Sequence, residues 1–216
     1  MDREKELNNC TQIKAMLMLI IVIYHSMRIF AGRGTWGPYL SMHDAPILGY
    51  ISDWLNSFHV YAFTLISGYI FCFIKYEKGG YQEYKSFISN KIKRLLVPYV
   101  FVAAVWVAPI HAYYFGTEGL AKKYLLGTTP SQLWFLLMLF WVFLIFWLLS
   151  DIIYRKPLFG GAIICVLYCM GFFMPGIYCI NSGLTYLLFF ILASSYEKLM
   201  PLVKSSIEYQ VSYIWL

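Results

Sequence analysis

Charged residues are scarce in this sequence. Asp, Glu, Lys and Arg together make up 13% of its 216 residues, whereas in soluble domains about a quarter of the residues are charged. None of the four occurs between Pro157 and Tyr196. Hydrophobic residues account for 60% of the chain. This composition excludes an ordinary soluble domain and indicates a protein that lies largely within a membrane.

Two further classes of protein are excluded by what is missing. The net charge of +6 does not come from one basic stripe, because the basic residues fall in the gaps between apolar runs, which is typical of membrane topology and not of nucleic-acid binding. The five cysteines form no pattern of a disulfide framework. Cys165 and Cys169 share a helix face, but no His or acidic residue lies nearby to complete a metal site. We therefore expect neither a nucleic-acid partner nor a metal, and interpret the cysteines as packing residues.

The long apolar runs predict membrane-spanning helices, each of which needs about 20 mostly apolar residues. Charged residues bound four such runs, and the uncharged stretch that ends at Tyr196 is long enough for a helical hairpin. We expect its break at Pro175–Gly176 and Asn181–Gly183. The predicted spans cover residues 15–31, 54–74, 95–117 and 133–149 and the two arms of the hairpin. Another apolar run begins at Val211. The sequence thus predicts an all-α polytopic membrane protein with about six complete transmembrane helices plus the start of a seventh.

The distribution of Lys and Arg predicts the orientation of these helices. The N-terminal segment and the loops after the second, fourth and sixth spans carry most of the basic residues, and the opposite loops carry few. Loops rich in Lys and Arg remain in the cytoplasm, so we expect a cytoplasmic N-terminus. Residues 1–12 lack a small-residue cleavage site and are interpreted as a retained leader. We expect residues 1–216 to form a single domain that is truncated at its C-terminal end.

Lys14 and His25 in the first predicted span are the first candidates for chemistry. They are eleven positions apart, which corresponds to about 16 Å along a helix and to nearly the same helix face. With Lys14 at the cytoplasmic interface, His25 lies near the middle of the bilayer. An imidazole can accept and return a proton near neutral pH, and ionisable groups inside a membrane are costly to keep. The alternative is a histidine bonded to a neighbouring helix and an interfacial lysine.

The second candidate is an aromatic-histidine pair, Phe58-His59, followed by Ser67-Gly68 in the second span. We expect His59 near the outer surface and Ser67 at about mid-depth. Gly68 permits the close approach of another helix. The alternative interpretation is an interfacial histidine and a packing notch of small residues.

The third candidate is a basic cluster, Lys91, Lys93 and Arg94, just before the third span. Lys91 and Arg94 share a face of a helix, and such a cluster is suited to binding a phosphorylated donor. The alternative is that cytoplasmic topology alone accounts for these bases.

The order of these features resembles the acyltransferase-3 family of membrane acyltransferases. That family has a basic residue and a histidine ten intervening residues apart in its first helix, an aromatic-His element before a Ser-Gly in the second, and a basic pair with a Pro-aromatic step before the third. A Trp-Phe pair opens a later span. The matching residues are Lys14 and His25, Phe58-His59 and Ser67-Gly68, Lys91 and Arg94 with Pro98-Tyr99, and Trp134-Phe135.

The resemblance implies transfer of an acetyl or similar short acyl group from acyl-CoA to a hydroxyl of a cell-surface polysaccharide or its lipid-linked precursor, in the plasma (inner) membrane. It implies acetyl-CoA as donor and, besides the bilayer, a saccharide acceptor as partner. His25 would be the general base or a transient acyl carrier. Lys14, with Lys91, Lys93 and Arg94, would engage the donor phosphates. A supporting pocket would be formed by His59, Ser67, Gly68 and Trp134.

The sequence departs from the family pattern at two places and leaves two other functions open. Lys replaces the usual Arg at positions 14 and 91, which keeps the charge but loses the bidentate fork. Thr11 stands where the family has an acidic residue. One alternative is a transporter or flippase-like component for a polar saccharide, but transporters usually repeat their broken helices in two halves, and no second half mirrors Lys14 and His25. The other is an inactive fragment.

Overall fold

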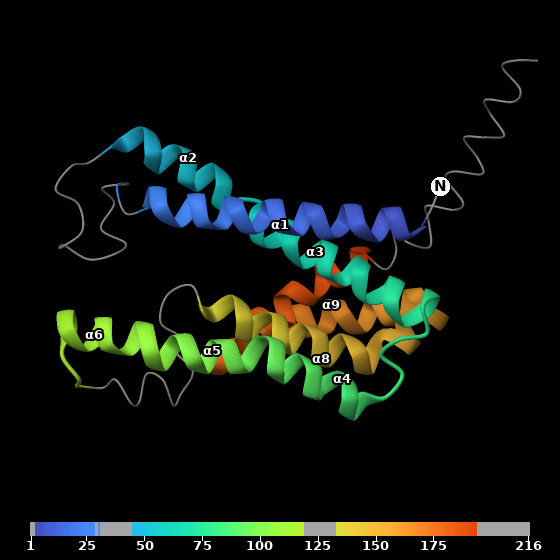
Figure 1. The fold of residues 1–216 in the computed structure, drawn as a ribbon. Helices are drawn as coiled ribbons and strands as arrows, with labels where there is room; N and C mark the ends of the chain where they lie inside the picture. The colour runs from blue at the N-terminus through green and yellow to red at the C-terminus, as the bar shows by residue number, and fades with distance from the viewer. Residues whose placement is uncertain (1–2, 29, 31–44, 119–132, 194–216) are drawn as a thin grey trace, which may run out of the picture. The chain divides into compact units, whose positions relative to one another are not determined.

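The computed structural model describes residues 3–28, 30, 45–118 and 133–193, and every regular element within them is a helix (Figure 1). The chain divides into two compact units, Met1–Ile70 (unit 1) and Phe71–Leu216 (unit 2). The elements of unit 1 are α1 (Arg3–Arg28), α2 (Pro46–Asn56) and α3 (His59–Cys72), which continues into unit 2. Those of unit 2 are η1 (Phe73–Glu77), α4 (Tyr84–Lys91), η2 (Ile92–Leu96), α5 (Val97–Val102), η3 (Ala103–Val107), α6 (Ala108–Phe115), α8 (Trp134–Arg155), α9 (Pro157–Phe173) and η5 (Ile177–Cys179).

Unit 1 is built from α1 and the α2–α3 pair. α2 begins with Pro46 at its first position, where the missing N–H of proline costs nothing. A turn at residues 57–58 separates α2 from α3. α3 buries the face that carries His59, Phe63 and Ser67, which lie at intervals of four residues along one side of the helix.

A second long helical segment, residues 84–115 of unit 2, contains two π-helical turns, η2 and η3. Each comes shortly before a proline, Pro98 and Pro109. Proline has no N–H for the carbonyl four residues earlier, and its ring clashes with that carbonyl. The carbonyls affected are those of Arg94 and Val105, which lie within η2 and η3. The two prolines therefore account for the wider turns, and the helix continues beyond both.

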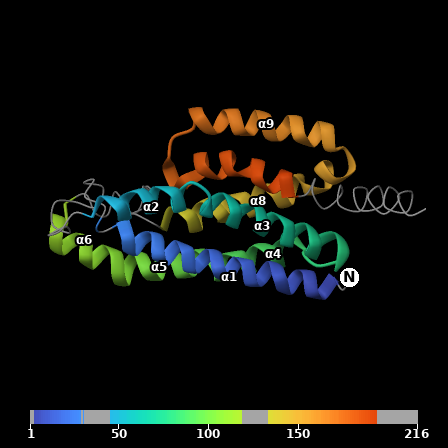
Figure 2. The same ribbon diagram turned by 90° about the horizontal axis from the view of Figure 1, so that it is seen from above.

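The core of unit 2 lies around α8, where Met138, Val142 and Phe146 are buried. α9 and residues 177–193 form the second half of the unit and lie side by side in Figure 2. Small residues permit the close approach of residues 177–193 to α9 and to α8. An added Cβ at Gly171 of α9 would lie 2.9 Å from the Thr185 side chain, and one at Gly183 would lie 2.7 Å from Cβ of Trp141 in α8.

The helices have the length and composition of membrane spans. Among the described residues four qualify, Leu7–Arg28, Pro46–Glu77, Tyr84–Tyr113 and Trp134–Arg155, and Pro157–Phe173 and Ile177–Ala193 are shorter apolar helices. The predicted all-α membrane fold is confirmed. The break at Pro175–Gly176 is also confirmed, because residues 174–176 separate α9 from the next helical segment. The additional break expected at Asn181–Gly183 is wrong, since residues 180–193 are helical. The seventh apolar run lies outside the described residues.

The helices are longer than the charge pattern predicts. α1 begins at Arg3 and not at Ala15, the second segment begins at Pro46 and not at Trp54, and the third begins at Tyr84 and not at Leu95. The added residues of α1 include Arg, Glu, Lys and Leu, which favour the helix even where they do not favour the bilayer. A charge therefore marks the edge of an apolar run without ending the helix.

Lys75 of η1 is a buried cation. The sequence pattern predicts it in the loop that follows the second span. Its side chain is 5% exposed. Its Nζ donates to Oγ of Ser150 at 2.6 Å and lies 3.1 Å from Oδ1 of Asp151. It also lies 4.7 Å from the centre of the Trp147 ring. The Ser150 hydroxyl donates its own proton to the Trp147 carbonyl, so its oxygen is left to accept from Lys75. Lys75 thus joins η1 to α8 through three different interactions.

Removing the charge of Asp151 is expected to destabilise unit 2 more than removing Lys75. Asp151→Asn leaves the buried cation without its counter-ion, and we expect a loss of about 1–3 kcal/mol, less than for a fully buried pair because the Asp151 side chain is 60% exposed. Lys75→Met removes the cation and keeps the stem volume, so we expect a smaller loss. Thermal unfolding of both variants in detergent measures the difference. A lower midpoint for Lys75→Met than for Asp151→Asn would contradict this account.

Candidate active site

The inner face of α1 carries the residues that the sequence pattern singled out. Lys14, His25 and Arg28 are half-buried and Leu17 is buried, whereas most of the intervening positions are exposed apolar side chains. α1 is uninterrupted from Arg3 to Arg28, so the 3.6-residue period holds these four side chains on one side. The remaining surface of the helix has the character of a lipid-facing surface.

Four contacts join this side of α1 to α2 and α3, which run antiparallel to it. Nζ of Lys14 lies 4.6 Å from the centre of the Phe63 ring. The ring of Tyr24 lies 5.0 Å from that of His59, centre to centre. At the far end of α1, Arg28 Nη1 forms an ion pair with Asp53 Oδ1 at 2.5 Å and donates to Ser52 Oγ at 3.3 Å.

His25 and His59 lie at one level between these ends. The Tyr24 ring is 4.6 Å from the His25 ring as well as 5.0 Å from the His59 ring. The sequence predicted different depths for them, with His25 at mid-bilayer and His59 at the outer surface. That expectation is wrong, because the register of α1 against α3 places both rings in contact with Tyr24.

His59 is held firmly in place. It is 2% exposed, and its Nδ1 lies 2.7 Å from the carbonyl oxygen of Leu55. Leu55 is near the end of α2, and its carbonyl also accepts a longer backbone hydrogen bond from Phe58 N at 3.5 Å. The imidazole forms the shorter of these two hydrogen bonds, so the turn between α2 and α3 fixes the ring.

Ser67 and Gly68 lie further along the buried face of α3. The Ser67 hydroxyl donates to the carbonyl of Phe63 at 2.8 Å and is 2% exposed. Its proton is therefore used within the helix. The ring of the same Phe63 contacts the Lys14 cation. Ser67 thus bonds to the backbone of the residue on which Lys14 packs. Gly68 is buried.

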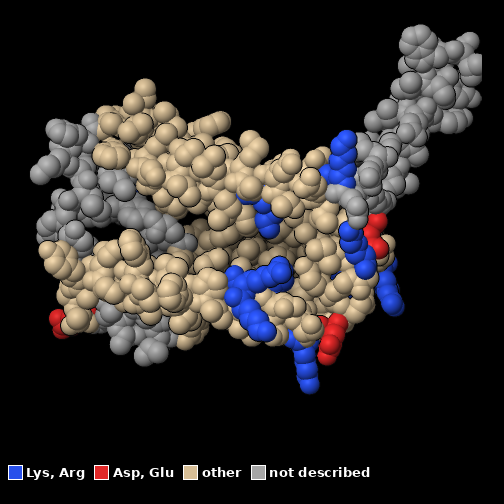
Figure 3. Space-filling model, viewed as in Figure 1, with Lys and Arg blue, Asp and Glu red and all other residues tan. Residues whose placement is uncertain are grey.

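The basic cluster predicted before the third span lies at the end of α4 and in η2. Lys93 and Arg94 are exposed, and Figure 3 shows basic side chains gathered on the surface near α4. Lys91 differs from them. Its Nζ lies 3.5 Å from the centre of the Phe143 ring, 5.2 Å from Phe87 and 5.3 Å from Tyr81. The Lys91 cation is thus held by aromatic faces.

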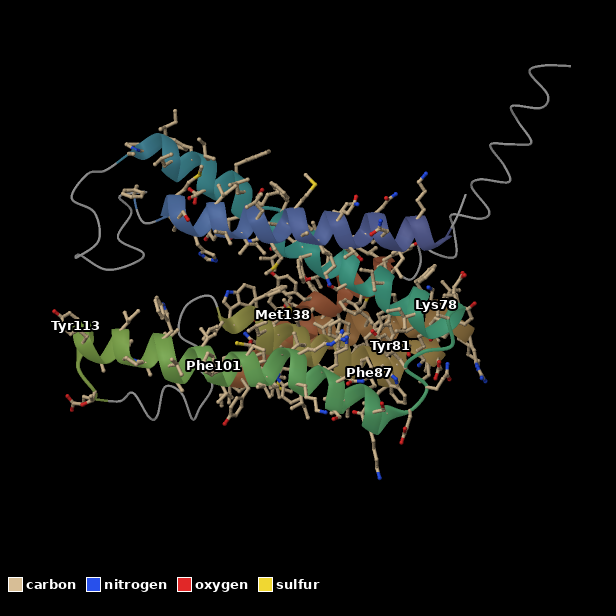
Figure 4. All side chains as sticks on the ribbon, viewed as in Figure 1. Lys78, Tyr81, Phe87, Phe101, Tyr113 and Met138 are labelled. Carbon is tan, nitrogen blue, oxygen red and sulfur yellow. The ribbon has the colours of Figure 1, made fainter. Side chains whose placement is uncertain are left out.

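Tyr81 lies beside Phe87 in the aromatic core of unit 2 (Figure 4), and its ring also contacts the Lys91 cation. Its ring stacks on Phe71 at 5.5 Å and its carbonyl accepts a hydrogen bond from Trp147 Nε1 at 2.8 Å. Its φ of 57° lies in the left-handed region, which is uncommon for a bulky residue. Burial raises the pKa of the Tyr81 hydroxyl above its ordinary value, and the nearby Arg94 cation opposes that rise. The hydroxyl is therefore a neutral donor beside the exposed bases.

Trp134, the last of the predicted pocket residues, lies at the start of α8 in unit 2. Its ring packs 5.9 Å from that of Tyr186. The predicted pocket residues therefore lie in both units, with His59, Ser67 and Gly68 in unit 1. Within the described ranges, no three His, Cys, Asp or Glu side chains form a group that could hold a metal ion.

Comparison with known families shows what the chain as a whole is similar to. A model of the acyltransferase-3 family, described as an acyltransferase domain, matches residues 9–207. The chain belongs to this family. It is therefore a membrane acyltransferase, with a multi-pass helical fold. Searches of curated proteins and of solved structures gave no match. The resemblance inferred from Lys14, His25 and the later elements is confirmed for the family as a whole.

Two elements of this candidate site were missed by sequence reasoning. Tyr24 was not singled out, although it precedes His25 and falls on the side of α1 that the 3.6-residue period turns inward. The Arg28–Asp53 pair was missed because Arg28 falls inside the first predicted span, and Asp53 was taken only as the boundary of the second. Their opposite charges at the outer ends of consecutive helices were a usable signal, because consecutive elements usually lie side by side.

Proposed function

We propose that this membrane acyltransferase is an O-acyltransferase that moves an acetyl or similar short acyl group from acyl-CoA to a hydroxyl of a cell-surface polysaccharide or its lipid-linked precursor. The observation that carries the proposal is the pair of imidazoles, His25 and His59, within unit 1 between the Lys14 cation and the Arg28–Asp53 ion pair. Acyl transfer to a hydroxyl requires a group that removes one proton, and imidazole is suited to this task near neutral pH.

In this mechanism His25 is the general base. It takes the proton of the acceptor hydroxyl as the oxygen attacks the thioester carbon, and the carbon–sulfur bond breaks to release the CoA thiolate. Tyr24 holds the His25 ring on one side and limits the access of water to it. The exposed apolar side chains around α1 keep this chemistry in a region of low dielectric constant, where hydrogen bonds to a developing charge are strong.

The acetyl-CoA donor carries phosphates that need cationic partners on the cytoplasmic side. Lys93 and Arg94 are exposed and can swing toward a phosphate, and Arg94 can bind it with two parallel hydrogen bonds. Lys91 adds positive potential from its aromatic surroundings. In unit 1, Lys14 offers a further cation on the half-buried side of α1. A cytoplasmic donor and a surface saccharide acceptor fit a protein of the plasma (inner) membrane with a cytoplasmic N-terminus.

Deleting the gene is expected to remove O-acetyl groups from a surface polysaccharide. Mass spectrometry of the purified polysaccharide should show the loss of one acetyl mass per modified sugar, and expression of the wild-type chain should restore it. Purified protein in lipid vesicles should transfer label from acetyl-CoA to the deacetylated polysaccharide. Unchanged acetylation in the deletion strain, with no transfer by the purified protein, would contradict the proposal.

A further inference from the structure

The hydrogen bond of His59 determines which of its nitrogens carries a proton. A carbonyl oxygen can only accept, so Nδ1, at 2.7 Å from the Leu55 carbonyl, must be the donor. In a neutral imidazole the other nitrogen then has a free lone pair. The contact to Leu55 therefore leaves Nε2 of His59 as a proton acceptor, in the same way that a backbone carbonyl fixes the tautomer of many functional histidines.

The surroundings of this nitrogen favour proton transfer. The ring is 2% exposed and lies on α3 against Tyr24, which also contacts the ring of His25. A fixed and buried imidazole requires little reorganisation when a charge arrives. A proton on the ring would also strengthen its bond to Leu55, because a charged donor forms a stronger hydrogen bond with a carbonyl than a neutral one.

We propose that His59 is a second catalytic residue of the acyl transfer, and that its Nε2 takes over the proton which His25 removes from the acceptor hydroxyl. This inference rests on the proposed O-acyltransferase function. The acceptor O–H bond breaks, its oxygen forms the ester bond, and the thioester C–S bond breaks with its electron pair on sulfur. The proton passes from His25 to His59 and finally to the thiolate, which leaves as the free thiol of CoA. His25 is thereby neutral again before the next acceptor binds.

His59→Asn separates this role from a structural one. The amide nitrogen of Asn occupies nearly the position of Nδ1 and can still donate to the Leu55 carbonyl, but the side chain has no counterpart of Nε2. We expect His59→Asn to remain folded, with kcat at least about tenfold lower and KM for acetyl-CoA unchanged. His59→Ala should lose activity as well, and added imidazole should restore part of its kcat.

Thr64→Val is the matched control. Thr64 is buried on the same helix, and its hydroxyl donates to the carbonyl of Val60, four residues back, as the His59 ring does to Leu55. Losing that bond should leave kcat unchanged. Wild-type kcat in His59→Asn would overturn the inference while the proposed function stands. Failure of added imidazole to raise the kcat of His59→Ala would overturn it in the same way. No transfer by the wild-type protein would overturn both.

Discussion

Replacing His25 with alanine is expected to lower the rate of acyl transfer by a factor of about 10² to 10⁴, the usual contribution of a general base. The side chain lies on the half-buried side of α1 against Tyr24, and its removal leaves the contacts of Lys14 and Arg28 in place. We therefore expect the variant to fold. Initial rates with labelled acetyl-CoA and a deacetylated polysaccharide, measured on equal amounts of protein in vesicles, give the factor.

The neighbouring residue provides the control for this experiment. Ser26 lies on the exposed side of the same helix, where its hydroxyl donates to the carbonyl of Val22. Ser26→Ala should retain the wild-type rate, because this side of α1 carries none of the candidate residues. A His25→Ala variant that elutes as folded protein and transfers acetyl at the wild-type rate would remove His25 from the mechanism. Equal losses in both variants would point to damage of α1 and not to lost chemistry.

The helical membrane fold could be predicted because it depends on composition and on the length of apolar runs. The bounds of the helices could not, because a charge was taken as the end of a span. Asp53 lies inside α2 and Asp151 inside α8, and each forms an ion pair within its unit, with Arg28 and Lys75 respectively. Pairing lowers the cost of a charge near the bilayer, and the pairing partner is distant in the sequence.

The candidate site could be predicted only along single helices. The period of α1 places Lys14 and His25 on one side without knowledge of any other element. The contact between Tyr24 and His59 depends on the register of α1 against α3, which the period of either helix leaves open. The same holds for Lys91. Its place between Phe143, Phe87 and Tyr81 depends on how α4 packs against α8. The sequence therefore predicted only that Lys91 binds the donor phosphates, and not that it packs on aromatic rings.

Gly160 and Gly161 are adjacent in α9, yet we expect opposite effects when each is replaced with alanine. A Cβ at Gly160 would lie 2.6 Å from Cα of Ile153 in α8, and one at Gly161 would meet only the tip of Ile191 at 3.9 Å. α8 and α9 are joined by Lys156 alone, so the two helices cannot separate near this point. Gly160→Ala should cost about 1–3 kcal/mol, as overpacking usually does. Gly161→Ala should stabilise the helix by up to about 1 kcal/mol.

The two variants differ by the position of a single methyl group, so their comparison removes any effect of composition or helix propensity. Thermal unfolding in detergent should give a lower midpoint for Gly160→Ala than for the wild type, and a midpoint for Gly161→Ala at or above it. Helix propensity alone would raise both midpoints equally. That result would mean that α9 can shift away from Ile153 at no cost. The close packing of α9 against α8 would then not depend on a glycine at position 160.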